Sequence, residues 1–442
     1  MLKGRFSKVL AVCFVALTTG LSLHAQDGAY TGFTPYSIFG VGDIFSQGSA
    51  YNRGMGGVGI ATRNRRFINY LNPAAVTARD SLAFMAEMSV TQGNKIFSQG
   101  DKSSVNNTFN VNNITLSFPI YRSSAMMVGI APYSSTGYQY SYILEDPSIV
   151  GNTGNAVFAS AGKGGTYQVF AAAGVTFWKR LSLGVEGKIL FGNISKNNLF
   201  SFAGSAYSNI NSGQELTLRG KSAKFGIQYE QPLGNSLTLG LGATYSMGTR
   251  LKGTVEDYRI SVGASQNDTL RFSRDTIGLS KDGVNIPQEF GVGISLSKSE
   301  NWKAEVNYSR SDWTSSGMDV AKGFAVKGSS SFDTRVSQAV RAGFEIVPNR
   351  NDVRYYYKRC TYRAGAYYET SSFAVDGNQV KDLGLTLGAS LPVNNNRYNA
   401  VTLAVGLGQR SAGIENLIRE RYVNFSIGFN FHDIWFRKVS YQ

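Results

Sequence analysis

The sequence predicts an all-β chain that folds as a transmembrane antiparallel β-barrel of about 14 strands, with an irregular N-terminal hatch inside its lumen. Three observations lead to this prediction. Apolar residues alternate with small or polar ones from Leu82 onward, and the links between alternating segments are by turns short and long. No stretch beyond the first 25 residues approaches the twenty apolar residues of a membrane-spanning helix.

Residues 1–25 have the pattern of a secretory signal peptide. Three basic residues precede the apolar run Val9 to Leu17, and Leu23-His24-Ala25 fits a small-residue cleavage site. The apolar run is too short to span a membrane. We therefore expect an exported mature chain that begins near Gln26.

The mature chain would hold few residues that carry chemistry. It keeps one cysteine, Cys360, and one histidine, His432. One cysteine cannot form an internal disulfide, and two candidate ligands are too few for a Cys/His zinc site. A catalytic triad would depend on His432 alone, and no nucleophile motif accompanies it. We expect no enzymatic activity, no metal and no cofactor.

Residues 26–80 show no period of 2 or 3.6, and we predict a hatch or plug there. Its expected gate residues are Gly54, Gly56, Gly57, Gly59, Asn72, Pro73 and Ala74. Glycine allows positive φ and close approach to another surface, while proline fixes a bend. Three of the glycines also fit a dinucleotide-binding fingerprint, but no hydrophobic strand precedes them, so we favour the hatch.

Fourteen alternating segments fill residues 81–432. They begin near Leu82, Asn112, Ala125, Gly165, Leu181, Gln214, Ser236, Asn285, Asn301, Phe332, Tyr357, Asp382, Asn399 and Glu420. Most run ten to fifteen residues, which is longer than an ordinary globular strand and enough for a tilted strand to cross a bilayer.

The links between these segments alternate in length. Short links are expected at Arg122 to Ser124, Lys179-Arg180, Gln231 to Asn235, Lys298 to Glu300, Pro348 to Asp352 and Pro392 to Arg397, and long ones at Ser134 to Lys163, Lys252 to Asp282 and Trp313 to Ser331. Outer-membrane barrels have short periplasmic turns, long outer loops and an even strand number. This order places both termini in the periplasm and leaves residues 433–442 as a periplasmic tail.

Charged residues indicate which face of each strand points to the lumen. The candidates, all opposite in parity to apolar neighbours, are Glu186, Lys188, Lys303, Glu305, Arg341 and Glu345. A Lys or Arg facing lipid costs about 2 to 4 kcal/mol at the bilayer midplane. A soluble sandwich or propeller is the alternative, but its polar face would favour Thr, Lys and Glu, and here that face is rich in Gly, Ser and Ala. Trp178 and Trp302, beside short turns, fit an aromatic girdle.

The formal net charge of +15 invites a nucleic-acid or anion interpretation. The basic residues are spread over turns, loops and lumen, and the densest run, Arg350, Arg354, Lys358, Arg359 and Arg363, straddles a short link. We favour attraction to the phosphates of membrane lipids and lipopolysaccharide, together with lumenal ion pairs, over nucleic acid. A basic lumen that favours anionic substrates remains an alternative.

The glycine-rich G-M-G-G-V-G-I-A segment, followed by Asn72-Pro73-Ala74 just before fourteen strands, resembles the FadL-type family of outer-membrane barrels. Tyr36 to Asp43, Y-S-I-F-G-V-G-D, and the tail Trp435 to Lys438 resemble the Bacteroidota members of that family. The resemblance implies a hatch in the lumen and passage of apolar small molecules, such as fatty acids, by a greasy route that leaves sideways through a gap at a kinked strand. Pro119 and Pro132 are candidates for that kink.

The same resemblance implies a second function. Bacteroidota relatives include accessory and plug barrels of the type IX secretion translocon, which act by docking to a large translocon barrel and not by conducting. The long polar loops and the C-terminal tail favour this alternative. In either case we expect a location in the cell outer membrane of a Gram-negative bacterium.

Overall fold

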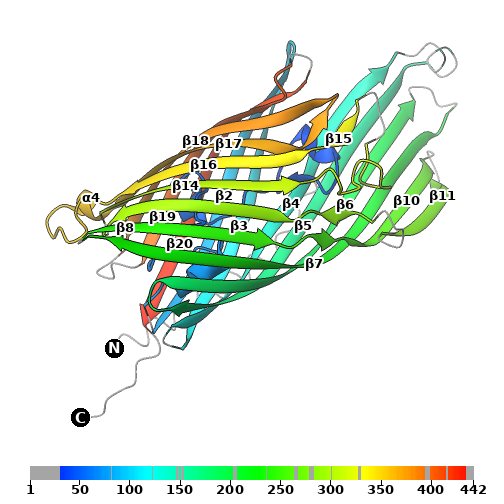
Figure 1. The fold of residues 1–442 in the computed structure, drawn as a ribbon. Coiled ribbons are helices and arrows are strands. Elements are labelled where there is room, and N and C mark those ends of the chain that lie inside the picture. The colour runs from blue at the N-terminus through cyan, green and yellow to red at the C-terminus, as the bar shows by residue number, and fades with distance from the viewer. Residues whose placement is uncertain are drawn as a thin grey trace, which may run out of the picture. The chain divides into compact units, whose positions relative to one another are not determined.

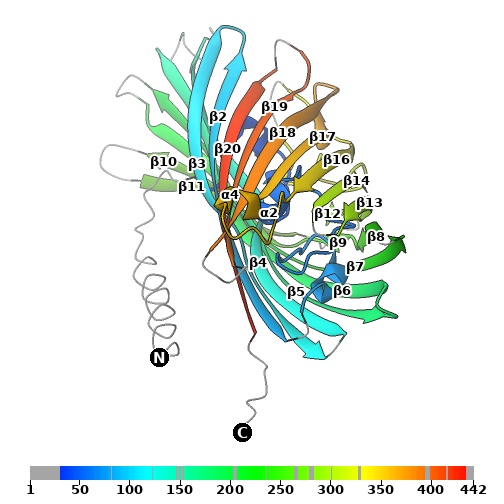
Figure 2. The same ribbon diagram turned by 90° about the vertical axis from the view of Figure 1, so that its left-hand side faces the viewer.

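The structure is a computed structural model that describes residues 30–434 except 81, 122, 146–147, 149–150, 152–153, 203–206, 235, 263–266, 278–282, 300, 327–329, 394–398 and 415–416. Fourteen of the described strands pair antiparallel with their neighbours, and the last of them pairs with the first, so the sheet closes into a barrel (Figures 1 and 2). The predicted fold class is confirmed. The expected signal peptide, and the tail beyond Ile434, lie outside the described residues.

The wall strands follow one another around the barrel in chain order. They are β2 (Ala83–Gln99), β3 (Lys102–Tyr121), β4 (Ser124–Leu144), β5 (Ala156–Phe177), β6 (Leu181–Phe202), β7 (Asn209–Leu233), β8 (Leu237–Ser246), β13 (Glu289–Lys298), β14 (Trp302–Asp312), β16 (Val336–Ile346), β17 (Thr361–Val375), β18 (Asn378–Pro392), β19 (Ala400–Ser411) and β20 (Arg419–Ile434). Twelve of them begin within five residues of the predicted positions.

The strand face that points away from the lumen is apolar. On β18, Leu383, Leu385 and Leu387 are 59%, 62% and 63% exposed, whereas Thr386 and Ser390 on the other face are buried. A closed sheet leaves no unpaired edge, and an apolar outer band is what contact with hydrocarbon chains requires.

The two ends of the barrel differ. At one end, which we call the turn end, two or three residues join β3 to β4, β5 to β6, β7 to β8 and β13 to β14. The opposite end, which we call the loop end, carries most of the longer links, although Gly100-Asp101 and Asp376-Gly377 there are two-residue turns. The described chain enters β2 and leaves β20 at the turn end.

Two expected long loops are largely strand. Ser134 to Lys163 was expected to be a loop, but β4 continues to Leu144 and β5 starts at Ala156. Lys252 to Asp282 contains the hairpin of β10 (Lys252–Val262) and β11 (Asn267–Ile277), which extends the sheet beside β7 at the loop end (Figure 1). In β4 the sequence does carry a strand signal, because Tyr138, Tyr140 and Tyr142 alternate with polar residues. In β10 and β11 charged and polar residues obscure the alternation.

Three further short strands complete the sheet pairing. The strand β9 (Thr249–Arg250) pairs with β12 (Asn285–Ile286), and β15 (Phe332–Thr334) pairs with β17. A four-residue helix, α4 (Tyr356–Arg359), lies in the link from β16 to β17. None of the helices in the described ranges is long and apolar enough to cross a membrane.

Candidate functional site

The N-terminal segment, residues 31–80, lies against the lumenal face of the wall strands (Figure 2). It contains the 3₁₀ helix η1 (Pro35–Ile38), the two-residue strand β1 (Asp43–Ile44), the helix α2 (Ala50–Arg53) and the 3₁₀ helix η2 (Pro73–Thr77). Three hydrogen bonds from buried asparagine side chains to backbone carbonyls hold its folded middle: Asn52 to Val58, Asn69 to Gly59 and Asn72 to Ile60, at 2.6–2.8 Å.

Glycines of the wall allow this segment to pack closely. They are Gly184, Gly226, Gly242, Gly343, Gly365, Gly388 and Gly428, on seven different strands, and a Cβ on any of them would lie 2.0–2.8 Å from an atom of the segment. Such distances are far shorter than van der Waals contact. The segment can therefore contact the wall this closely only because these seven wall residues have no side chain.

All seven predicted gate residues are buried in this packing. Gly56 and Gly57 have φ of +71° and +78°, values that favour glycine, and the amide of Gly56 donates to the Thr386 hydroxyl at 2.8 Å. Asn72 caps η2, since its side-chain oxygen accepts from the amide of Ala74 at 3.0 Å. Pro73 begins that helix, where its missing N–H costs nothing.

The six charged candidates lie on the buried or half-buried strand face. Glu186, Glu305 and Glu345 are buried, and Lys188, Lys303 and Arg341 are half-buried. Two of them bond to the N-terminal segment. Glu305 accepts from the amide of Ala61 at 2.9 Å and from the Thr62 hydroxyl, and the Lys303 ammonium donates to the carbonyl of Arg63 at 3.0 Å.

Charged side chains of the wall contact the segment in two further places. Glu345 of β16 pairs at 2.8 Å with Arg363 of β17, whose guanidinium lies 4.2 Å from the ring centre of Tyr51 in the segment. Arg63 pairs with Glu230 at 3.0 Å. Burial lowers the pKa of Arg63, and the neighbouring Glu230 carboxylate acts in the opposite direction. The sequence analysis placed Arg363 in a basic run at a turn and did not single out Glu230, although the parity of both residues predicts the lumenal face.

A cavity of about 450 Å³, lined by both charged and apolar side chains, lies inside the barrel, between the middle of the N-terminal segment and its first residues. Six acidic and six basic side chains line it: Asp43, Glu186, Glu289, Glu369, Asp382 and Glu420, and Arg53, Lys95, Lys188, Lys224, Arg341 and Arg410. Several are paired, including Arg341 with Glu369 and Arg410 with Asp43. The family resemblance implied an apolar route, whereas this lining combines paired charges with apolar side chains such as Phe170 and Trp313.

Beside this cavity the wall is split between β3 and β4. Their pairing runs from Tyr121 to Ile114 on β3 and stops there, so residues 102–113 of β3 have no partner in β4. Both strands are irregular at this point: the β2–β3 register skips Asn112, and the β4–β5 register skips Tyr133. A residue added to one strand bends it and ends pairing.

Pro132 precedes the irregularity in β4, and Pro119 does not mark the split. Pro132 pairs with Tyr167 just two residues past Ile130, the last β4 residue paired with β3. A proline has no N–H to donate to a neighbouring strand. Pro119 lies close to the turn at Tyr121 to Ser124, where a shift of register leaves the neighbouring pairing intact.

Residues 31–47, which we call the strap, cover the β4 side of the split. Asp43 and Ile44 pair with Ser135 and Ser134, and the amide of Thr34 donates to the carbonyl of Gly137 at 2.8 Å. The other side of the strap is held by Arg410, which pairs with Asp43 at 2.7 Å. The sequence has no period over the strap, so its pairing with a wall strand could not be foreseen.

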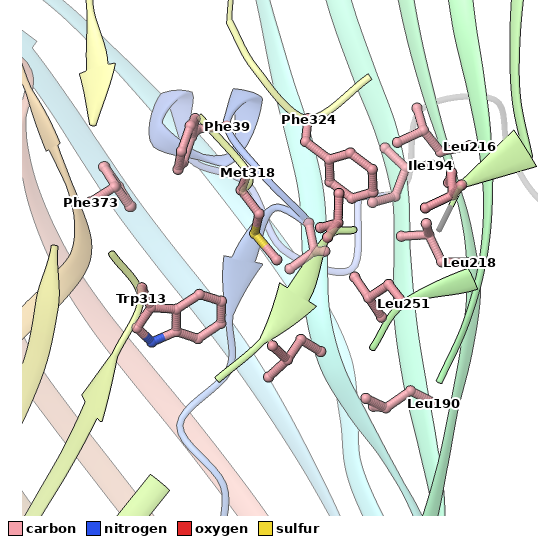
Figure 3. Close-up of a cluster of buried hydrophobic side chains, with 14 of the residues drawn as sticks. Phe39, Leu190, Ile194, Leu216, Leu218, Leu251, Trp313, Met318, Phe324 and Phe373 are labelled. Carbon is pink, nitrogen blue, oxygen red and sulfur yellow. The ribbon is translucent and has the colours of Figure 1, made fainter. Parts of the chain in front are cut away.

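The loop end of the barrel is filled by apolar side chains. Residues 313–326, which we call the inner loop, bring Trp313, Met318 and Phe324 against the strap and the wall (Figure 3). The residues around them include Phe39, Leu190, Ile194, Leu216, Leu218, Leu251 and Phe373. The three inner-loop residues are at most 6% exposed. The sequence showed this stretch only as a long link.

A family model named BamG matches residues 6–442. The chain belongs to the BamG family. No curated protein sequence matches it significantly. A group of three or more His, Cys, Asp or Glu side chains placed to hold a metal ion is not found within the described ranges.

Solved FadL-type barrels share the fold of this BamG-family chain. The Pseudomonas putida toluene transporter TodX matches with a TM-score of 0.59 and 13% identity, over 90% of this chain and 100% of that one. The Ralstonia pickettii toluene transporter TbuX gives 0.56 and 14%, over 87% and 98%. A Pseudomonas aeruginosa FadL homologue gives 0.53 and 10%, over 88% and 98%. The resemblance to FadL-type barrels is confirmed for the fold, while membership of a Bacteroidota branch stays a prediction.

Proposed function

We propose that this protein is an outer-membrane barrel in which small apolar molecules, such as fatty acids, pass sideways between lumen and bilayer through the split between β3 and β4. In this proposal residues 31–80 are the hatch, and the turn end, with both termini, is periplasmic. The observation that carries the proposal is the split itself. It begins at Ile114 and Ile130, both 38% exposed on the outer apolar face, so it opens at the level of the lipid.

Two further observations support passage at this position. Unpaired backbone in a membrane is tolerated only where protein or a water-filled cavity satisfies it, and the cavity reaches Asn110 and Asn112 of β3. The similar structures include proteins described as toluene transporters, which have the same fold. The strap, which occupies the β4 edge of the split, would have to move for a molecule to pass.

A disulfide between the strap and the wall tests whether the strap must move for a molecule to pass through the split. Ile44→Cys and Ser134→Cys replace directly opposed residues, so oxidation should lock the strap. We expect a Gram-negative host that lacks its own transporter of this class to take up labelled palmitate or toluene when it expresses the protein. Oxidation should reduce uptake at least tenfold, and a reductant should restore it, while each single-cysteine variant stays unaffected. Equal uptake with and without the lock would contradict passage through the split.

A second function, that of a non-conducting accessory subunit of a larger outer-membrane assembly such as the type IX translocon, is favoured by a different observation. The turn end is packed by residues 48–80 and the loop end by the inner loop, and ion pairs cross the cavity between them. Isolation in a gentle detergent distinguishes the two functions. A lone barrel with a bound apolar ligand supports passage, and a far larger assembly without ligand supports the accessory function.

A further inference from the structure

The link between β16 and β17, residues 347–360, is unlike the others at the turn end. We call it the basic turn. It is fourteen residues long, whereas the links after β3, β5, β7 and β13 have two or three residues. It carries four basic side chains, Arg350, Arg354, Lys358 and Arg359, and one carboxylate, Asp352. Figure 1 shows its helix α4 at the far end of the barrel from the β10–β11 hairpin.

Three of the four basic side chains of this turn lie close to a tyrosine ring. The Arg354 guanidinium lies 5.1 Å, and the Lys358 ammonium 4.7 Å, from the ring centre of Tyr355. Arg359 lies 5.2 Å from the ring centre of Tyr356. Such contacts hold the cations close to the rings. The Lys358 ammonium also pairs with Asp352 at 3.5 Å, and Arg354 is exposed while Arg359 is half-buried. The result is an ordered cluster of positive charge, in contrast to the spread of basic residues elsewhere.

Hydrogen bonds hold the turn beside the outer face of the barrel. The hydroxyl of Tyr362, a residue on the exposed face of β17, donates to the carbonyl of Tyr357 at 3.0 Å. The hydroxyl of Tyr356 donates to the carbonyl of Pro392, at the end of β18, at 2.9 Å. The turn is thus tied to two wall strands at the edge of their apolar band. Its tip residue, Val353, is apolar and 95% exposed.

Tyrosines at the end of an apolar band mark the membrane–water interface, and clustered Lys and Arg next to it attract anionic lipids. We propose that the basic turn binds the phosphates of anionic phospholipid headgroups in the leaflet at the turn end, with Val353 entering the interface. This inference rests on the proposed outer-membrane location, and it holds for either proposed function. A lipid surface accounts for the cation cluster, the exposed aromatic rings and the exposed apolar tip together. An acidic protein surface would account for the cations but not for the exposure of Val353.

Brominated lipids test the proposal, because bromine quenches a nearby tryptophan. Val353→Trp would be reconstituted in phosphatidylcholine vesicles that contain either dibromo-phosphatidylglycerol or dibromo-phosphatidylcholine, with the unsubstituted chain as the reference for its own tryptophans. We expect the added fluorescence to be half-quenched at a several-fold lower mole fraction of the anionic lipid. Adding Arg354→Gln and Arg359→Gln should remove that preference. The matched control, Lys179→Gln with Arg180→Gln, removes two exposed charges from another turn at the same end and should keep it.

Equal quenching by both lipids, or a preference that survives loss of Arg354 and Arg359, would overturn the lipid site. Absence of quenching in an inserted barrel would place the tip in water and favour an acidic protein partner. Insertion itself is measured separately, by flotation with the vesicles and by resistance of the barrel to protease. Failure to insert would count against the outer-membrane location, and an inserted but unquenched barrel counts against the lipid site alone.

Discussion

At the scale of single residues, the N-terminal segment can pack closely because several wall residues are glycines and have no side chain. Gly226 of β7 faces the segment, and a Cβ there would lie 2.0 Å from the side-chain oxygen of Asn72 and 2.8 Å from Pro73. Gly187 of β6, in contrast, has no atom within 4 Å of the position of a Cβ. The sequence shows both as glycines in alternating strands, and only the structure separates them.

The pair gives a matched test of that packing. We expect Gly226→Ala to destabilise the protein by about 1 to 3 kcal/mol, because an added methyl group in a tight core forces neighbours to shift. The loss should appear as a lower midpoint of thermal unfolding and as faster protease cleavage within residues 48–80. Gly187→Ala should change neither quantity by a measurable amount. Similar behaviour of the two variants would mean that the segment is not packed against β7 in the membrane-bound protein.

At the scale of elements, the alternation of apolar and polar residues predicted the wall strands well. It did not predict the irregular contacts between elements. A strand in lipid must place apolar residues on every second position, so the band of β8, β18 and β20 could be recognised in the sequence. The predicted starts of β3, β5 and β7 are five to ten residues late, because polar residues at the start of β3 and β7, and Ala and Gly at the start of β5, weaken the alternation. Pro132 was a useful signal for the split, whereas Asn112 carries no signal, since a bulge depends on its partner strand.

The strap is the element whose attachment can be tested most directly. Its ion pair between Asp43 and Arg410, at 2.7 Å, is reinforced by the Arg410 guanidinium lying 5.5 Å from the ring centre of Tyr36. We expect Arg410→Gln to loosen the strap while the wall remains closed. Amide hydrogen exchange should become at least tenfold faster in residues 31–47 and stay unchanged in β5 and β6.

The control for the strap is another arginine ion pair, in the β10–β11 hairpin. Arg274 of β11 pairs with Glu256 at 2.7 Å, and its side chain is 65% exposed. Arg274→Gln should therefore leave the exchange of residues 31–47 as it is in the unsubstituted chain. If Arg410→Gln also leaves it unchanged, the strap is held by its pairing with β4 alone.

At the scale of the whole barrel, two closures lie in series. Residues 48–80 pack against glycines of seven wall strands, and the inner loop closes the loop end with Trp313, Met318 and Phe324. The sequence predicted a hatch at residues 26–80, and it gave no sign that the inner loop closes the other end. Ions that pass one of these barriers would still meet the other.

We therefore expect neither removal alone to produce a large conductance. Deleting Gly54 to Ala75 should leave the apolar cluster at the loop end, and replacing residues 314–325 by a short Gly-Ser linker should leave the packed segment at the turn end. With two barriers in series, the barrier that remains in each single variant limits its conductance. Only the double variant should therefore show stable single-channel currents in planar bilayers, at least tenfold above either single variant. Heat-modifiable migration on gels would verify that each barrel is intact. A full-sized current from the Gly54 to Ala75 deletion alone would mean that the inner loop does not seal the loop end. Movement of residues 54–75 would then be enough to open a pore along the barrel axis, and the argument for a lateral route would fail.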